Sequence, residues 1–468
     1  MRRTPEEIKT CVEDLLSRMT LEEKIGQMVQ SAGADTTAIG GEVKTSPLEG
    51  LIAEGKIGSI IYMPDSAAMA RRLQRIAVEK SRLGIPLIFC QDVIHGFQTI
   101  FPIPLGWSCS FDPDLVRRAT EISAREATRA GVMLAFAPML DIARDPRWGR
   151  ISEGAGEDPF LDACMARAEV LGYQGGEGGQ GLGDGEHMAC CLKHFVGYGA
   201  AEAGRDYNTV EISPSTLHNV YLPAFQAGVD AGAATVMPSF NLVDGVSSAA
   251  SPYVLQELLR KELGFDGVII SDYAAVFEVI AHGLAADERE AAERCANAGL
   301  DIEMATDLFN RELPQLVMEG KVPESLVDDA VRRILTLKYR LGIMDDPYLY
   351  MHEGEEEAAL RPRTWRSRAA WRRSPPSSSR TTARCRCARA QRSRWSAPAP
   401  TARTSWAPGS SPSARTAPPR CARAWRKRAS PCCASPPRPS TRSSSAASTA
   451  RSSSRASATS WSSPSART

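Results

Sequence analysis

The chain has 468 residues, 43% of them hydrophobic, and its 56 Lys and Arg nearly balance its 55 Asp and Glu. No apolar run reaches the length needed to cross a membrane. We expect a globular protein that binds neither a membrane nor nucleic acid.

The neutral total conceals two different polypeptides. Residues 361–468 contain 23 Arg, one Lys and no acid, which leaves 32 basic against 55 acidic side chains in residues 1–360. This tail also lacks Leu, Ile, Val, Met, Phe and Tyr, so it cannot bury enough apolar surface to offset chain entropy, and we expect it to be disordered. A nucleic-acid-binding arm and a plain linker are alternatives. The abrupt change favours a shifted reading frame near Leu360, because a GC-rich gene read out of frame yields Arg, Ala, Ser and Pro.

The first 360 residues suffice for one large α/β barrel or two ordinary domains. Their seven scattered Cys suggest small buried residues in a reducing compartment. The first residues lack the apolar stretch of a signal peptide, so we expect a cytoplasmic protein.

Short apolar runs alternate with helical stretches from residue 57 onwards. The runs predict strands at residues 57–62, 86–91, 132–137, 188–192, 234–237 and 268–271, a seventh near 279–283 and an eighth at 299–304. Asp-Pro and Ser-Pro pairs predict helix starts at Asp112, Asp158, Ser213 and Ser251. Repeated strand–helix order implies a parallel sheet, and about eight units fit a TIM-like (β/α)8 barrel better than an open sheet. We assign this barrel to residues 1–345 and a linker to residues 346–360.

A barrel would gather the polar residues that follow these strands on one rim. Asp272 ends an apolar run, although an Asp there could also cap the next helix. Lys193 and His194 are adjacent, so both reach one ligand only if the strand twists or bulges; otherwise Lys193 lies in solvent and His194 is bonded in the rim. The loop of residues 141–150 places Arg residues around Trp148, which is typical of sugar binding but also of a salt-bridged surface loop.

Two other classes of site fit poorly. Residues 176–181 match a dinucleotide fingerprint, but they follow a helix and precede a strand, which places them opposite the rim as a flexible connection. The His and Cys spacings match no metal motif, so we expect no metal and disfavour a metal-dependent barrel hydrolase.

Six motifs occur in order between residues 10 and 355. They are DVIHG at 92–96, RDPRWGR at 144–150, EDP at 157–159, KHF at 193–195, VMPS at 236–239 and SD at 271–272. This set resembles the N-terminal barrel of family 3 glycoside hydrolases and is most similar to bacterial β-glucosidases.

The resemblance implies a retaining exo-acting β-glucosidase that needs no cofactor. Asp272 would attack the anomeric carbon and form a glycosyl-enzyme. The terminal sugar would be held by Asp92, Arg150, Lys193 and His194, with Met237 and Ser239 beside them. Lys193 and Arg150 would favour ionised Asp272. The expected ligand is a β-glucoside or oligosaccharide.

Two departures from the family pattern matter. Phe240 stands where many relatives have Tyr, which removes a hydroxyl donor. The general acid looks to come from a second α/β sandwich domain, and residues 361–468, where a remnant of that domain is expected, hold no acid. The N-acetylglucosaminidase branch uses a His after the Lys-His strand, and residues 197–199 offer none. We therefore expect impaired turnover, and a catalytically silent carbohydrate-binding barrel is the alternative.

Overall fold

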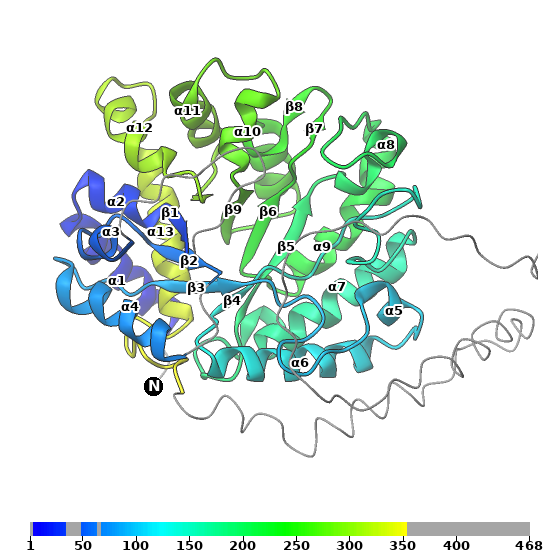
Figure 1. Cartoon of the computed structure of the whole chain (residues 1–468), viewed down its shortest axis with the longest axis horizontal. Coiled ribbons are helices and arrows are strands. Elements are labelled where there is room, and N and C mark those ends of the chain that lie inside the picture. The colour runs from blue at the N-terminus through cyan, green and yellow to red at the C-terminus, as the bar shows by residue number, and fades with distance from the viewer. Residues whose placement is uncertain (1–2, 34–47, 63–66, 353–468) are drawn as a thin grey trace, which may run out of the picture. The chain divides into compact units, whose positions relative to one another are not determined.

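A computed structural model of the protein describes residues 3–33, 48–62 and 67–352 (Figure 1). The predicted tail at residues 361–468, its expected disorder and the frame shift near Leu360 lie outside the described residues. Among the described helices, none is both long and apolar enough to span a bilayer.

Eight parallel strands close into a barrel in the order β1-β10-β9-β6-β5-β4-β3-β2, with helices around the outside (Figure 1). The predicted TIM-like (β/α)8 barrel is therefore confirmed. The barrel strands are β1 Val29–Ala32, β2 Ser59–Ile61, β3 Ile88–Gln91, β4 Leu134–Ala135, β5 Ala189–Phe195, β6 Thr235–Pro238, β9 Val268–Tyr273 and β10 Ile302–Met304. A separate antiparallel hairpin, β7 Leu242–Val243 and β8 Val246–Ser247, follows β6.

The strands are short and buried on both faces. All seven residues of β5 are buried, as expected for a parallel sheet with side chains filling the barrel inside and helices covering it outside. This double burial explains why the strands appear in the sequence as continuous apolar runs without alternation.

The outer helices begin where the sequence predicts. Asp112 accepts a hydrogen bond from Leu115 N, Asp158 from Leu161 N, Ser213 from Thr216 N and Ser251 from Val254 N. Each of these oxygens satisfies a backbone donor of a first helical turn. The α-helices are α1 Pro5–Arg18, α2 Leu21–Gln27, α3 Leu48–Ala53, α4 Ala67–Lys80, α5 Pro104–Ser108, α6 Pro113–Arg129, α7 Pro159–Gln174, α8 Pro214–Thr216, α9 Leu222–Asp230, α10 Ala275–Ala281, α11 Glu288–Ala298, α12 Leu308–Met318 and α13 Glu324–Arg340; π-helical turns span Leu217–Tyr221 and Tyr253–Glu262.

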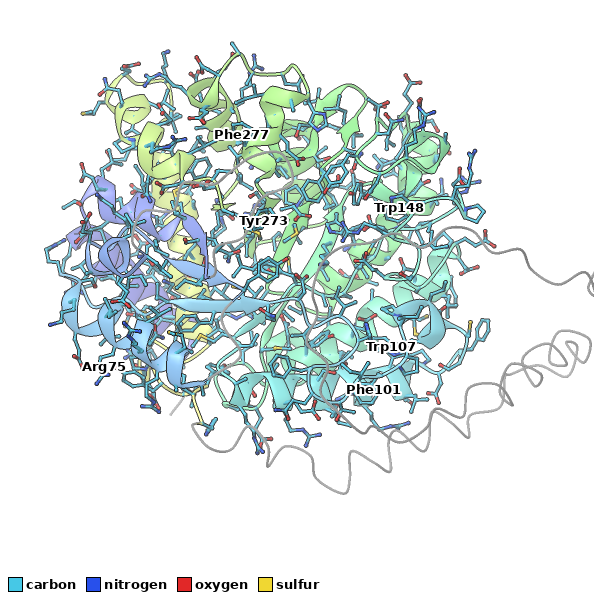
Figure 2. The ribbon with its side chains drawn as sticks, viewed as in Figure 1. Arg75, Phe101, Trp107, Trp148, Tyr273 and Phe277 are labelled. Carbon is cyan, nitrogen blue, oxygen red and sulfur yellow. The ribbon has the colours of Figure 1, made fainter. Side chains whose placement is uncertain are left out.

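The prediction of a strand near residues 279–283 is wrong. Val279 belongs to helix α10, which buries Val276 and Val279 at helical spacing and leaves Phe277 45% exposed. Figure 2 shows Phe277 toward the outer edge while Tyr273, at the end of β9, lies among the barrel strands. The eighth strand is instead β1, whose sequence Val-Gln-Ser-Ala is too short and polar to show as an apolar run.

The chain after α13 packs back onto the barrel. Tyr350 and Met351 are buried, and the Met351 carbonyl accepts a hydrogen bond from Arg71 Nη2. The first residues of the predicted linker are thus part of the packed structure. The glycine-rich segment of residues 175–185 connects α7 to β5, as its sequence order indicates.

Candidate active site

The carboxyl ends of the strands surround a cavity of about 170 Å³. It is lined by Ile61, Tyr62, Asp92, Phe136, Arg150, Lys193, His194, Tyr207, Met237, Phe240, Asp272, Tyr273 and Met304. Six of the seven predicted site residues therefore meet at one place, because the parallel barrel brings all strand ends to the same rim. Asp272 shares this cavity with Asp92 and Lys193, as the sequence predicts.

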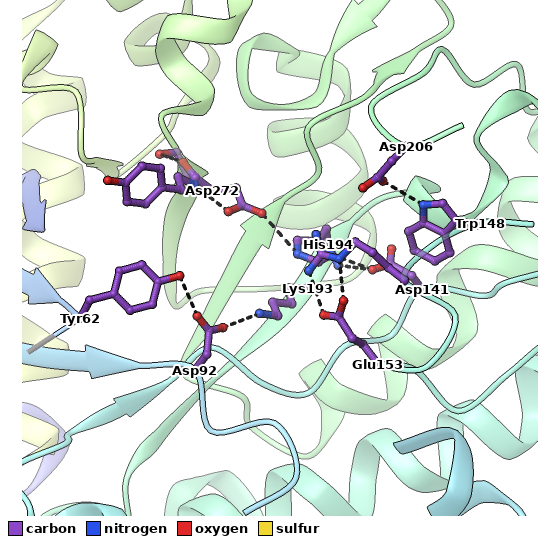
Figure 3. Close-up of polar contacts among 12 residues, drawn as sticks. Tyr62, Asp92, Asp141, Trp148, Glu153, Lys193, His194, Asp206 and Asp272 are labelled. Atoms are coloured by element: carbon purple, nitrogen blue, oxygen red, sulfur yellow. Dashed lines mark hydrogen bonds and ion pairs between the residues drawn. The ribbon is translucent and has the colours of Figure 1, made fainter. Parts of the chain in front are cut away.

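Asp272 stands at the end of β9 with its carboxylate facing the cavity (Figure 3). Oδ1 accepts a 2.6 Å hydrogen bond from Tyr273 N, and Oδ2 lies 3.3 Å from His194 Nε2. Burial raises the pKa of Asp272 to about 6, although the charges of Lys193 and Arg150 act to lower it. The two cations thus act in the predicted direction, and desolvation outweighs them. Helix α10 has Ala274 as its N-cap residue, so the capping alternative for Asp272 is excluded.

Lys193 is bound to Asp92 across the cavity. Its Nζ lies 2.7 Å from Asp92 Oδ1, and the Tyr62 hydroxyl donates to Asp92 Oδ2 at 3.0 Å. Burial works against a charged Lys193, but the carboxylates of Asp92 and Asp272 prevail and raise its pKa. Asp92 therefore stays next to a protonated amine, with both of its oxygens engaged.

A bulge lets two neighbouring residues of β5 share the cavity. The register of β5 against β6 shifts between Lys193 and Phe195, and the Lys193–His194 peptide bond is cis. Lys193 and His194 both line the cavity. The predicted condition for their joint action, an irregular strand, is met.

His194 is held from behind by a residue that the sequence did not single out as a site residue. Asp141 Oδ2 lies 2.7 Å from His194 Nδ1 and also accepts a 3.1 Å hydrogen bond from His194 N (Figure 3). Both side chains are only 1% exposed. The residue pair is 53 positions apart in sequence, and no local spacing signals it.

The loop after β4 divides its basic residues between the cavity and the surface. Arg150 faces the cavity, is bound to both oxygens of Glu153 at 2.9 Å, and lies over the Tyr198 ring at 5.5 Å. Arg147 pairs with Asp145 on the surface, where its side chain is 68% exposed. The salt-bridged surface loop is thus found at Arg147, whereas sugar binding by Arg150 stays a prediction.

Trp148 does not offer a face to a sugar. It is 1% exposed, and its Nε1 donates to Asp206 Oδ1 at 2.9 Å (Figure 3). The sugar-binding alternative for this loop therefore has no support from Trp148, whose ring packs against Tyr198 with centroids 5.2 Å apart. Its hydrogen bond to Asp206 restrains the segment that carries Tyr207, which lines the cavity.

Met237 and Ser239, from the same motif, have different positions. Met237 lines the cavity. Ser239 is fully buried behind it, where its hydroxyl donates to Val196 O and contacts Ser248 Oγ at 2.8 Å. Direct contact between Ser239 and a ligand therefore has no support in this geometry.

Aromatic side chains form one side of the cavity. The Tyr207 ring lies 4.7 Å from the Phe240 ring, centroid to centroid. Phe240, which lacks the hydroxyl that a Tyr would have, is therefore packed against the phenol of Tyr207. Burial and the nearby acids Glu278 and Asp272 raise the pKa of Tyr207 to about 12, which keeps its proton. The sequence analysis missed Tyr62, Tyr207 and Tyr273; Tyr62 and Tyr273 lie at strand ends, whereas Tyr207 lies in a loop with no such signal.

Asp92 and Asp272 are the two carboxylates that line the cavity among the described residues. Both oxygens of Asp92 already have a partner, Lys193 on one and Tyr62 on the other. Glu278, on α10, does not line the cavity; burial and the charge of Asp272 raise its pKa to about 7. Within the described ranges, no group of three or more His, Cys, Asp or Glu side chains is arranged to hold a metal ion.

A larger hollow of about 760 Å³ lies between α1, α13 and the glycine-rich segment. No residue from the carboxyl end of a barrel strand lines it. We place the site at the smaller cavity, because the charged groups that can act on a ligand converge there.

Comparison with known proteins fits this geometry. Residues 20–337 match the model of the glycosyl hydrolase family 3 N-terminal domain. The chain belongs to glycoside hydrolase family 3. It is 39% identical over 354 residues to a periplasmic β-glucosidase of Salmonella typhimurium, covering 76% of this chain and 45% of the relative, and 34% identical to a lysosomal β-glucosidase of Dictyostelium discoideum, covering 72% and 44%.

The family 3 barrel also matches solved structures. A β-glucosidase from Listeria innocua in complex with isofagomine has 42% identity and a TM-score of 0.72, over 79% of this chain and 51% of that one. The same enzyme has been solved with glucose, and a mutant of it with laminaribiose. The chain spans about half the length of the relatives that it matches.

Proposed function

We propose that the protein is a retaining, exo-acting β-glucosidase. The observation that carries the proposal is the convergence of Lys193 and Arg150 on the buried carboxylate of Asp272 in one small cavity. Two fixed cations beside a carboxylate favour its ionised form and accept a polyol by charge-assisted hydrogen bonds. Solved relatives in complex with glucose and with laminaribiose support the same substrate class.

In the proposed reaction, a carboxylate oxygen of Asp272 attacks the anomeric carbon as the bond to the aglycone oxygen breaks. The aglycone oxygen takes a proton from solvent water, and the sugar remains as an ester on Asp272. A second water then attacks the same carbon, loses its proton to the hydroxide left in solvent, and regenerates the carboxylate. Asp92, Arg150 and Lys193 would hold the hydroxyls, with Met237 as an apolar wall and His194 beside Asp272.

The cavity volume supports action on one terminal sugar. About 170 Å³ is several times the ~30 Å³ that one water occupies in the liquid. That space suits a single monosaccharide ring, whereas the rest of the substrate would extend outward. The proposed partner is thus a small β-glucoside or oligosaccharide, rather than nucleic acid or a membrane.

We also propose that turnover is impaired because residues 361–468 supply no general acid. They contain no carboxylate side chain. Loss of general acid help costs ~10²- to 10⁴-fold in rate. A frame shift near Leu360 remains our explanation of the tail, and sequencing the gene for a one-base correction that restores a normal domain tests it.

The test uses glucosides that differ in leaving group. A 2,4-dinitrophenyl β-glucoside needs no proton on departure, so the chain should hydrolyse it, whereas laminaribiose should be cleaved far more slowly. Asp272→Asn should abolish both reactions. A 2-fluoro glucosyl inhibitor should add mass to the peptide containing Asp272; mass on another residue would refute the nucleophile.

The alternative is a catalytically silent carbohydrate-binding barrel. It predicts glucose binding by calorimetry, with no release of dinitrophenol from folded protein at any pH.

We propose a cytoplasmic location, which the free cysteines of the described residues, among them adjacent Cys190 and Cys191, support. Fractionation of the source cells tests this location.

A further inference from the structure

Three side chains form a row that ends at the nucleophile (Figure 3). Asp141 Oδ2 lies 2.7 Å from His194 Nδ1, and His194 Nε2 lies 3.3 Å from Asp272 Oδ2. The imidazole therefore stands between two carboxyl groups, with one ring nitrogen facing each. Asp141 and His194 are 1% exposed, so water is excluded from their contact, whereas Asp272 is 13% exposed at the cavity.

We propose that Asp141 is a positioning residue that keeps the proton of His194 on Nε2, where it is donated to Asp272. This inference rests on the proposed role of Asp272 as nucleophile and adds to it a group that never touches the sugar. Asp272 Oδ1 is already fixed by Tyr273 N at 2.6 Å. His194 Nε2, 3.3 Å from Oδ2, would orient the second oxygen and keep the carboxylate in line for attack.

The pKa shifts of Asp141 and His194 indicate where the protons of this row lie. Burial raises the pKa of Asp141 well above its usual range, and burial with Arg150 and Lys193 lowers that of His194. A proton held by Asp141 and donated to Nδ1 along the 2.7 Å contact satisfies both directions, because a neutral His194 that accepts at Nδ1 carries its hydrogen on Nε2.

Other charged groups face this row. Arg150 lowers the pKa of Asp141, whereas Asp162 and Glu153 raise it. The Tyr198 ring meets the His194 ring edge-on at 5.1 Å, and the Tyr198 hydroxyl stays protonated because burial raises its pKa. Asp141 is thus surrounded by two acids and one cation, which favours retention of its proton.

Replacement of Asp141 by Asn should move the hydrogen of the His194 ring from Nε2 to Nδ1. Asp141 Oδ2 also accepts a hydrogen bond from His194 N, so the oxygen of the Asn side chain must take the position of Oδ2. The amide nitrogen then takes the position of Oδ1, which is buried and has no partner in the described structure. That amide oxygen can only accept, so Nδ1 must carry the hydrogen. Nε2 then presents a bare lone pair to Asp272.

The test is imidazole ¹⁵N NMR of the full chain, with His194 assigned by His194→Gln. At pH 7.5, Nε2 should be protonated in the wild type and unprotonated in Asp141→Asn. Glu169→Gln is the matched control, because Glu169 is also a fully buried acid but lies on α7 without a contact to His194; it should keep the wild-type tautomer. An unprotonated Nε2 in the wild type overturns the proposal, and that measurement needs no variant.

Kinetics with the dinitrophenyl glucoside give a second measure. Asp141→Asn should lower kcat by roughly 10²-fold, as loss of one fixed donor does, and should move the acidic limb of kcat/KM upward. Asp141→Asn with wild-type kcat and an unmoved acidic limb contradicts the proposal. If the wild type hydrolyses nothing, the proposed function fails, whereas the NMR result still decides the role of Asp141.

Discussion

Lys193 Nζ lies 2.7 Å from Asp92 Oδ1, and this ion pair joins the ends of β5 and β3 although the two residues are 101 positions apart. The Tyr62 hydroxyl occupies the other oxygen of Asp92 at 3.0 Å. Asp92 therefore has one charged and one neutral partner, which separate variants can remove.

Lys193→Met should lower the free energy of unfolding by about 1–3 kcal/mol, because it leaves a mostly buried carboxylate with one donor. The loss stays below that of a fully buried pair, since the Asp92 side chain is 30% exposed. Tyr62→Phe, the control, removes a neutral donor and should cost about 1 kcal/mol. Urea unfolding measures both; equal losses would show that the charge contributes nothing.

Hydrolysis should depend on pH through Asp272. Only the ionised carboxylate attacks, and burial raises its pKa to about 6, so kcat/KM should fall tenfold per unit below about pH 6 and level off above it. The charge of Lys193 lowers that pKa, so Lys193→Met should shift the acidic limb upward. A pH series with the dinitrophenyl glucoside checks this, and a limb near pH 4 would contradict it.

Trp148→Phe should weaken substrate binding without contact between Trp148 and the sugar. The change keeps a buried ring but loses the hydrogen bond to Asp206, which anchors the segment that carries Tyr207. We expect KM to rise by up to about tenfold, equivalent to about 1.4 kcal/mol. Arg147→Ala, a change at the neighbouring surface residue, should leave KM unchanged and should alter the free energy of unfolding by less than about 0.5 kcal/mol. A larger effect of Arg147→Ala would mean that the whole loop, and not Trp148 alone, supports substrate binding.

Lys338 links three chain segments at the amino-terminal end of the barrel. Its fully buried Nζ donates to Gln27 Oε1, Gly58 O and Pro86 O at 2.6, 3.0 and 2.7 Å. Lys338→Met should cost about 3–5 kcal/mol of unfolding free energy, because three buried acceptors lose their donor. Lys321→Met, at a side chain that is 50% exposed, should change it by less than about 0.5 kcal/mol. Similar effects for the two variants would mean that the three contacts do not matter.

The sequence alone determined the barrel and most of its rim. Seven strands appear as apolar runs because both faces of a parallel strand are buried, and helix starts such as Asp112 are visible because a cap is a contact between residues three positions apart. Asp92, Lys193 and Asp272 could be predicted because each follows a strand, and a parallel barrel leaves strand ends no other place than one rim.

Only the tertiary structure decided how these residues are used. Strand β1 is too polar to stand out, and residues 279–281 have the composition of a strand but the burial of a helix. Asp141, Trp148 and Tyr207 acquire their roles from partners that the fold brings close, and such contacts leave no periodic trace in the chain. Local patterns report burial along one segment, whereas hydrogen-bond partners and pKa values depend on what lies across the cavity.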